Sequence, residues 1–229
     1  MSYDERKLCV VCAWRGSCQL KYSMPGGVAL HCVEFTRDIT LKATEEELRK
    51  RNLVLIGPAG AGKTTLIRKV LERTGLKADG YYTREVKDGL LRAHVELVFL
   101  SGETHILADS KSHPGWLRVG KWHVDGEMVE SVLIPRLRAA RQSKETEVIV
   151  LDEGGQLVGV SGQYRKEAID CVVSSKSVLA AVSLGEEDKE LLQRLERRAD
   201  VTLLRVAPDT RDALVGQIAL MLTGERQRA

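Results

Sequence analysis

Apolar positions along the 229-residue chain change their period several times, and these changes predict alternating strands and helices. Four consecutive apolar residues at 53–56, and again at 148–151, are typical of strands buried on both faces. Between 66 and 71 the apolar residues recur three or four positions apart, which predicts an amphipathic helix that Gly75 can end. Residues 81–107 alternate with a period of two around a turn at 87–89, which predicts antiparallel strands.

The second half of the chain repeats the change between helical and extended patterns. Residues 126–141 have a helical pattern that Pro135 is expected to kink or end. Further helices are predicted at 163–174, 187–197 and 210–222, and strands at 178–182 and 201–206. Strands that alternate with helices imply a parallel sheet. The predicted fold class is therefore α/β, with a mostly parallel sheet and added antiparallel strands.

A glycine-rich segment follows the first apolar strand directly. It reads Gly57-Pro58-Ala59-Gly60-Ala61-Gly62-Lys63-Thr64-Thr65, a complete Gly-x4-Gly-Lys-Thr phosphate loop. Its glycines let successive backbone N–H groups converge on an anion at the positive end of the next helix. Lys63 is expected to reach the β and γ phosphates, and the Thr64 hydroxyl to bind Mg²⁺. The nine residues therefore predict a site for a nucleoside triphosphate.

Two acids follow the second apolar run. Asp152 and Glu153 come directly after residues 148–151. Acids at the carboxyl end of a buried parallel strand face the crevice in which such sheets bind ligands. We expect Asp152 to complete the nucleotide site and hold Mg²⁺ through water, and Glu153 to orient and polarise an attacking water. Lys63 and Glu153 are thus the predicted catalytic residues. Without a phosphate loop, the two acids would equally suit a helix cap or a solvated turn.

Four of the five cysteines lie in the first 32 residues, as Cys9, Cys12, Cys18 and Cys32. Turn-forming residues at 24–27 would bring Cys32 back towards Cys9 and Cys12. In a reducing compartment this clustering favours zinc or an iron–sulfur cluster, and free or oxidised thiols are the alternative. We predict a Cys-rich metal-binding module at 1–44 and a nucleotide-binding domain at 45–229. Cys171 is expected to be a small buried residue in a helix.

Composition narrows the range of partners. Lys and Arg number 35 and Asp and Glu 32, so the net charge of +3 gives no electrostatic argument for nucleic acid or an anionic membrane. Nucleic acid is left open only through local patches. No apolar run approaches the roughly 20 residues needed to cross a bilayer, and the first residues lack a secretion signal, so we expect a cytoplasmic protein. The Cys-rich module is a candidate surface for a protein partner.

These motifs, in this order, resemble the small nucleoside-triphosphatases of the THEP type. The resemblance covers about residues 51–220 and rests on five segments: the phosphate loop, 80–86 (GYYTREV), 118–122 (RVGKW), the strand that ends at Asp152-Glu153, and 206–212 (VAPDTRD). It implies a RecA-like P-loop NTPase fold that carries an extra strand and a catalytic glutamate. It also implies slow, Mg²⁺-dependent hydrolysis of ATP, GTP and other nucleoside triphosphates, with nucleotide contacts at 57–64 and around 148–155.

The chain departs from the family pattern in two places. Residues 154–157 read Gly-Gly-Gln-Leu where the family usually has Ile-Gly followed by Met-Glu, so one downstream acid is missing. Ser183 stands where the family often has Thr-x-His, and its hydroxyl is a candidate sensor of the γ-phosphate. Two alternatives to hydrolysis stay open: a kinase for a small acceptor, and a nucleotide-dependent switch or metal-cofactor adapter with slow hydrolysis.

Several basic side chains are candidates to neutralise charge on the transferred phosphoryl group. The sequence does not choose among them, and a surface salt bridge is the alternative role for each. The five candidates are Arg84, Arg118, Lys121, Arg194 and Arg211.

Overall fold

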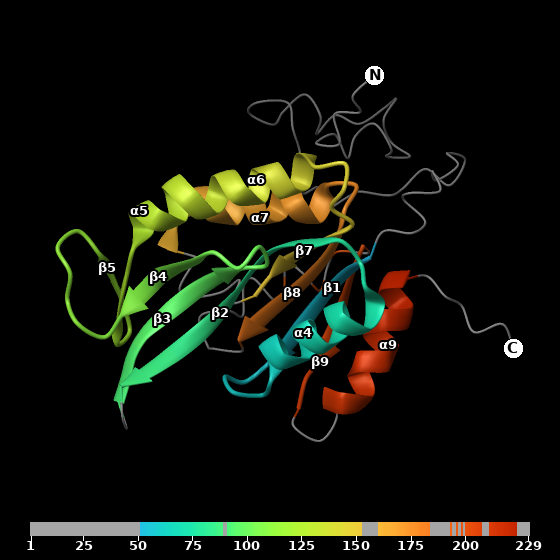
Figure 1. Cartoon of the computed structure of the whole chain (residues 1–229), viewed down its shortest axis with the longest axis horizontal. Helices are drawn as coiled ribbons and strands as arrows, with labels where there is room; N and C mark the ends of the chain where they lie inside the picture. The colour runs from blue at the N-terminus through green and yellow to red at the C-terminus, as the bar shows by residue number, and fades with distance from the viewer. Residues whose placement is uncertain are drawn as a thin grey trace, which may run out of the picture.

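The computed structural model describes residues 51–88, 91–152, 160–183, 193, 196, 198, 200–207 and 211–223. These residues contain one nine-stranded sheet with the order β5-β6-β4-β3-β2-β7-β8-β1-β9 (Figure 1). The parallel part consists of β1 (Asn52–Gly57), β2 (Ala78–Asp88), β7 (Val148–Leu151), β8 (Ser177–Ser183) and β9 (Val201–Arg205). The antiparallel extension consists of β3 (Leu91–Phe99), β4 (Thr104–Asp109), β5 (Leu117–Val119) and β6 (Trp122–Val124). This mixed sheet confirms an α/β fold with added antiparallel strands, but four of the eight pairings between the described strands are antiparallel, so the sheet is not mostly parallel.

Helices cover both faces of the sheet (Figure 1). One face carries α4 (Lys63–Thr74) and α9 (Arg211–Thr223). The other carries α5 (Gly126–Met128), the π-helix η1 (Val129–Leu133), α6 (Ile134–Gln142) and α7 (Gly162–Val173). Alternate residues of β1 enter the two cores: Leu55 packs on the α4 side and Val54 on the α6 side. Burial on both faces explains why the sequence of β1 is apolar without interruption.

Strand β8 lies between the strand that leads into the phosphate loop and the strand that leads to Asp152. It pairs in parallel with both, so that Ser183 lies beside Gly57 and Ala180 beside Leu151. The carboxyl ends of β1, β8 and β7 therefore open on the same edge of the sheet. The family resemblance implies an extra strand in the sheet, without fixing its position.

Most predicted elements are present, with ends that differ by a few residues. Helix α4 ends at Gly75, whose φ of 62° is the left-handed conformation expected of a C-terminal glycine. The two short strands β5 and β6 were not predicted, because three residues are too few to establish a period.

The helix predicted at 126–141 does not end at Pro135. The π-helix η1 precedes the proline, and the backbone N–H of Ile134 donates to the carbonyl of Val129 in a wider turn. Pro135 then occupies the first turn of α6, where its missing N–H and fixed φ are tolerated. Of the two expected outcomes, a kink or an end, the end is therefore wrong, because the helical chain continues to Gln142.

Several predictions fall on residues outside the described ranges. They are the Cys-rich module with Cys9, Cys12, Cys18 and Cys32, the domain boundary near 45, the turn at Gly89, the catalytic candidate Glu153, and most of the helix at 187–197. Among the helices that the structure does describe, none combines the length and the apolar character needed to cross a bilayer.

Candidate nucleotide site

The phosphate loop is shaped by contacts that only glycine permits. A β-carbon at Gly57 would lie 2.5 Å from the carbonyl oxygen of Val206. The first residue of the loop must therefore be glycine, because a side chain there would collide with the chain at the end of β9. Gly62 has a φ of 90°, in the left-handed region, and is the residue from which α4 starts. The first turn of α4 follows at once, and the backbone N–H of Leu66 donates to the carbonyl of Gly62 at 2.9 Å.

Lys63 is a buried ammonium at the start of α4, with 7% of its surface exposed. Its Nζ donates to the carbonyl oxygens of Gly57 and Pro58, both at 2.9 Å. A buried charge needs such partners, because its lost hydration is otherwise not replaced. The two carbonyls belong to the phosphate loop itself, so the Lys63 side chain folds back over this loop.

Asp152 lies at the carboxyl end of β7 and is 3% exposed. Its Oδ2 accepts a hydrogen bond from the Thr64 hydroxyl at 2.6 Å and one from the backbone N–H of Thr83 at 3.4 Å. Its own backbone N–H donates to the carbonyl of Tyr81 at 3.3 Å. The hydrogen bond between Thr64 and Asp152 spans 88 residues of chain and joins the phosphate loop to the acidic strand end, as the sequence predicted for these two elements.

The Thr64 hydroxyl and the Asp152 carboxylate fit a magnesium ion in chemical type. Both are oxygen donors, and they already lie within one hydrogen bond of each other. In the described part of the chain, no three His, Cys, Asp or Glu side chains gather as a metal-binding group. Mg²⁺ at a nucleotide site does not require such a cage, since it keeps several waters and takes further ligands from substrate phosphates.

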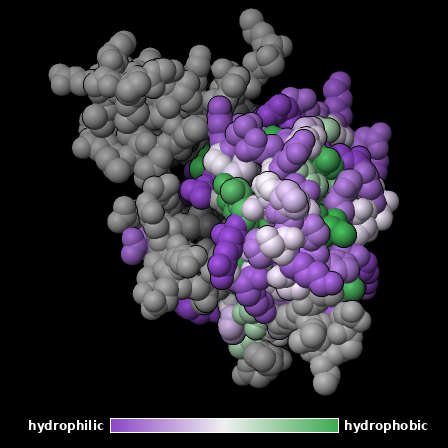
Figure 2. Space-filling model, turned by 90° about the vertical axis from the view of Figure 1, so that its left-hand side faces the viewer, coloured by the Kyte–Doolittle hydropathy of each residue, from purple (hydrophilic) through white to green (hydrophobic). Residues whose placement is uncertain are grey.

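The basic side chains that the sequence offers to neutralise charge on the transferred phosphoryl group lie in different parts of the fold. Arg84 donates its Nε to Glu96 at 2.8 Å on neighbouring strands, and this contact raises the pKa of the Arg84 guanidinium. Arg118 and Lys121 lie at β5 and in the turn before β6, at the sheet edge opposite β9, and both are exposed. Figure 2 looks onto that end of the molecule, where most described side chains are hydrophilic, as on a solvated surface. Arg194 lies outside the described residues.

Arg211, by contrast, lies against the phosphate loop. A β-carbon at Gly62 would meet both Cδ and Nη1 of Arg211 at 2.8 Å. Its neighbour Asp212 accepts a hydrogen bond from Lys69 of α4 at 2.8 Å, and this bond lowers the pKa of the Asp212 carboxyl. The start of α9 is thus tied to the first turns of α4.

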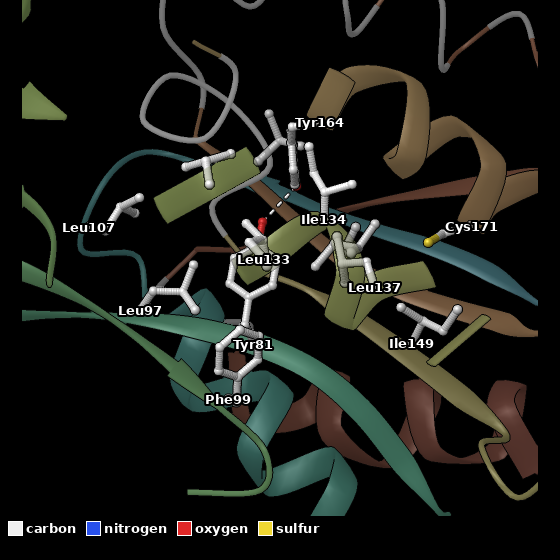
Figure 3. Close-up of a cluster of buried hydrophobic side chains, with 14 of the residues drawn as sticks. Tyr81, Leu97, Phe99, Leu107, Leu133, Ile134, Leu137, Ile149, Tyr164 and Cys171 are labelled. Atoms are coloured by element: carbon white, nitrogen blue, oxygen red, sulfur yellow. Dashed lines mark hydrogen bonds between the residues drawn. The ribbon is translucent and has the colours of Figure 1, made fainter. Parts of the chain in front are cut away.

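A buried pair of tyrosines supports the strand beside Asp152. Tyr81 of β2 and Tyr164 of α7 point towards each other, and their hydroxyl oxygens are 2.6 Å apart (Figure 3). Both rings are buried in the core on the α6 side. Sequence reasoning did not identify this pair, although Tyr81 lies in the 80–86 segment that carries part of the family resemblance. The partner is 83 residues away, and no local pattern indicates it.

Cys171 is a buried residue of α7, as predicted, and it lies in the same core (Figure 3). Burial raises the pKa of its thiol from 9.0 to about 12, and the nearby Glu167 carboxylate acts in the same direction. A thiol of this kind stays protonated near neutral pH, so Cys171 suits packing rather than nucleophilic chemistry or metal binding.

Comparison with known proteins shows the family to which this chain belongs. A family model described as NTPase matches residues 52–219. The Nucleoside-triphosphatase THEP1 of Thermotoga maritima is 31% identical over 178 residues, which cover 76% of this chain and 99% of the relative. The human Cancer-related nucleoside-triphosphatase is 32% identical over 192 residues, with coverage of 77% and 99%.

Two solved structures have a similar fold. The crystal structure of THEP1 from the hyperthermophile Aquifex aeolicus matches with a TM-score of 0.65 and 27% identity, covering 76% of this chain and 99% of the other. The solution structure of a human cancer-related nucleoside triphosphatase matches with a TM-score of 0.64 and 30% identity, covering 77% and 100%. The phosphate loop and Asp152 both lie within residues 52–219, which the family model matches.

Proposed function

Because the chain belongs to the nucleoside-triphosphatase family, we propose that its phosphate loop and the acids after β7 hydrolyse Mg²⁺-bound ATP, GTP and related triphosphates. The products are a nucleoside diphosphate and inorganic phosphate. The observation that carries the proposal is the 2.6 Å hydrogen bond from Thr64 to Asp152. It holds a hydroxyl of the loop and a strand-end carboxylate at one point, where both can serve the same ion.

The loop binds the polyphosphate in this account. The backbone N–H groups between Gly57 and Thr65 donate to phosphate oxygens, and the Lys63 ammonium exchanges its two loop carbonyls for β- and γ-phosphate oxygens. The Thr64 hydroxyl would ligate Mg²⁺, and the Asp152 carboxylate would hold the ion through water. When bound, Mg²⁺ neutralises charge on the β and γ phosphates. Ser183, which lies beside Gly57 in the strand register, is the proposed hydroxyl contact of the γ-phosphate.

Glu153 handles the proton of the attacking water. The water oxygen forms a bond to the γ-phosphorus while the bond from that phosphorus to the β,γ-bridging oxygen breaks. The electron pair of that bond leaves with the diphosphate, and the water proton passes to the Glu153 carboxylate. The support for this role is that Glu153 follows Asp152 directly in the sequence, and Asp152 lies at the carboxyl end of β7.

The variant Glu153→Gln tests this role. The amide keeps the shape of the side chain but cannot take the proton, so we expect nucleotide binding to persist while phosphate release falls by about 10²- to 10⁴-fold. Phosphate release is measured with no acceptor other than water, which also separates hydrolysis from a kinase reaction. Glu72→Gln, at an exposed position of α4, is the matched control. Equal turnover by Glu153→Gln and wild type would remove Glu153 from the mechanism.

For the first 44 residues we propose a separate metal-binding module, with zinc or an iron–sulfur cluster held by the four cysteines and a protein partner as its candidate ligand. The support is the clustering of Cys9, Cys12, Cys18 and Cys32 in the sequence. A colourless protein with one zinc per chain would favour a structural site, and visible absorption with bound iron would favour a cluster. A full-length protein that carries neither metal would contradict the module.

A further inference from the structure

The strand that leads into the phosphate loop, β1, has a neighbouring strand on each side, and the two neighbours bring different residues to the loop. On one side of β1 lie β8 and β7, which bring Asp152 to Thr64. On the other side lies β9, whose end packs against Gly57 through Val206. The chain then enters α9 at Arg211, and the backbone N–H of Arg211 donates back to the carbonyl of Ala207 at 3.0 Å. This second side of the loop has no role in the mechanism described above.

The Arg211 side chain lies directly on the loop. Cδ and Nη1 both come within 2.8 Å of the point that a β-carbon on Gly62 would occupy. The side chain is only 32% exposed, so most of its surface is covered by protein. Gly62 precedes Lys63, the residue expected to bind the β and γ phosphates. The Arg211 guanidinium therefore lies beside the part of the loop that is expected to bind phosphate.

The Nε–H of Arg211 is a buried donor that makes no hydrogen bond within the described residues. The Oδ1 of Asp212 is 3.7 Å from it, which is too far for a hydrogen bond. That oxygen instead accepts from Lys69 at 2.8 Å. Leaving a buried donor without an acceptor costs free energy, so proteins keep few such groups without a reason. An anionic ligand on the loop would supply the missing acceptor.

We propose that Arg211 binds the α- and β-phosphates of the bound nucleotide, on the side of the loop away from Asp152. This inference rests on the proposed function, in which Thr64 and Asp152 would hold the Mg²⁺ that accompanies the β and γ phosphates, on the β8 and β7 side of the loop. The polyphosphate then runs from the γ-phosphate at that side towards β9, where Arg211 lies. Contacts to α- and β-phosphates are the same in substrate, transition state and diphosphate product. Arg211 therefore sets affinity for both nucleotides and leaves the chemical step unchanged.

The test compares wild type with Arg211→Gln and Arg211→Lys. Binding is titrated with Mg²⁺-ADP, with a non-hydrolysable ATP analogue and with inorganic triphosphate. We expect Arg211→Gln to bind all three at least 10-fold more weakly, the size of one hydrogen bond to a charged group, while kcat stays within about threefold. Arg211→Lys keeps the charge but loses the planar fork, so its affinity should fall in between. Arg73→Gln, at an exposed position in the last turn of α4, is the control.

Each outcome decides a different point. A large fall in kcat with unchanged affinity would overturn the proposal in favour of a transition-state arginine. Unchanged binding of all three ligands would overturn it outright. Weaker ADP binding with unchanged triphosphate binding would transfer the contact from the phosphates to the nucleoside. If wild type itself bound none of the three ligands, the proposed function would fail instead. Thermal unfolding without ligand shows that each variant is folded.

Discussion

Lys63, Asp152 and Glu167 are three charged side chains that the described fold buries. Their partners separate residues of the candidate nucleotide site from a structural ion pair. Glu167 accepts from Arg141 at 3.0 Å, a pair that joins α6 to α7. Lys63 and Asp152 are held by two loop carbonyls and by the Thr64 hydroxyl. These hydrogen bonds tie Lys63 and Asp152 to the phosphate loop, whereas the Glu167 pair joins two helices on the other face of the sheet.

At the residue scale, Cys171 predicts a pH dependence of stability. Burial raises the pKa of the folded thiol to about 12, above the 9.0 of a free thiol. The stabilisation is therefore complete below pH 9 and is lost as the pH rises from 9 towards 12, by up to about 1.4 kcal/mol per pH unit. We expect the difference in unfolding free energy between wild type and Cys171→Ala to shrink over this range, measured by urea unfolding in reductant. A constant difference would mean that the thiol is not buried in this way.

At the scale of elements, the sequence predicted those features that short segments encode. The phosphate loop and the acids after β7 each occupy a few consecutive residues, and both follow apolar strands. By contrast, nothing local to Arg211 shows that it would lie on Gly62, 149 positions earlier, while Arg84 and Arg118 would not. The π-helix before Pro135 was likewise not predictable, because helical periodicity does not separate it from an α-helix of the same length.

The tyrosine pair gives a prediction about how two elements are joined. Tyr81→Phe or Tyr164→Phe removes the hydrogen bond between the two buried hydroxyls, so each single variant should lose about 1 kcal/mol of unfolding free energy. The double variant should lose clearly less than the sum, because either single variant already removes the shared hydrogen bond. Tyr82→Phe, on the same strand but partly exposed, is the matched control and should change stability by about 0.5 kcal/mol or less. Additive losses in chemical denaturation would contradict a direct hydroxyl pair.

At the scale of the whole molecule, the sheet explains how distant segments form one site. Strands β7, β8, β1 and β9 are neighbours and run in parallel, so the residues that follow them meet at one edge. The antiparallel strands β3 to β6 extend the opposite end, and the basic residues of the 118–122 segment lie there rather than at the loop. The site thus depends on the parallel part of the sheet and on α4, α7 and α9, which pack on its two faces.

The central claim is that the phosphate loop and Asp152 share one metal-bound polyphosphate. A crystal structure with Mn²⁺ in place of Mg²⁺ and a non-hydrolysable triphosphate analogue tests it, because anomalous scattering locates the manganese directly. The account predicts a peak about 2 Å from the Thr64 hydroxyl oxygen and one bridging water from the Asp152 carboxylate, with the phosphates along residues 57–65. A peak elsewhere, with Thr64 still bonded to Asp152, would contradict it.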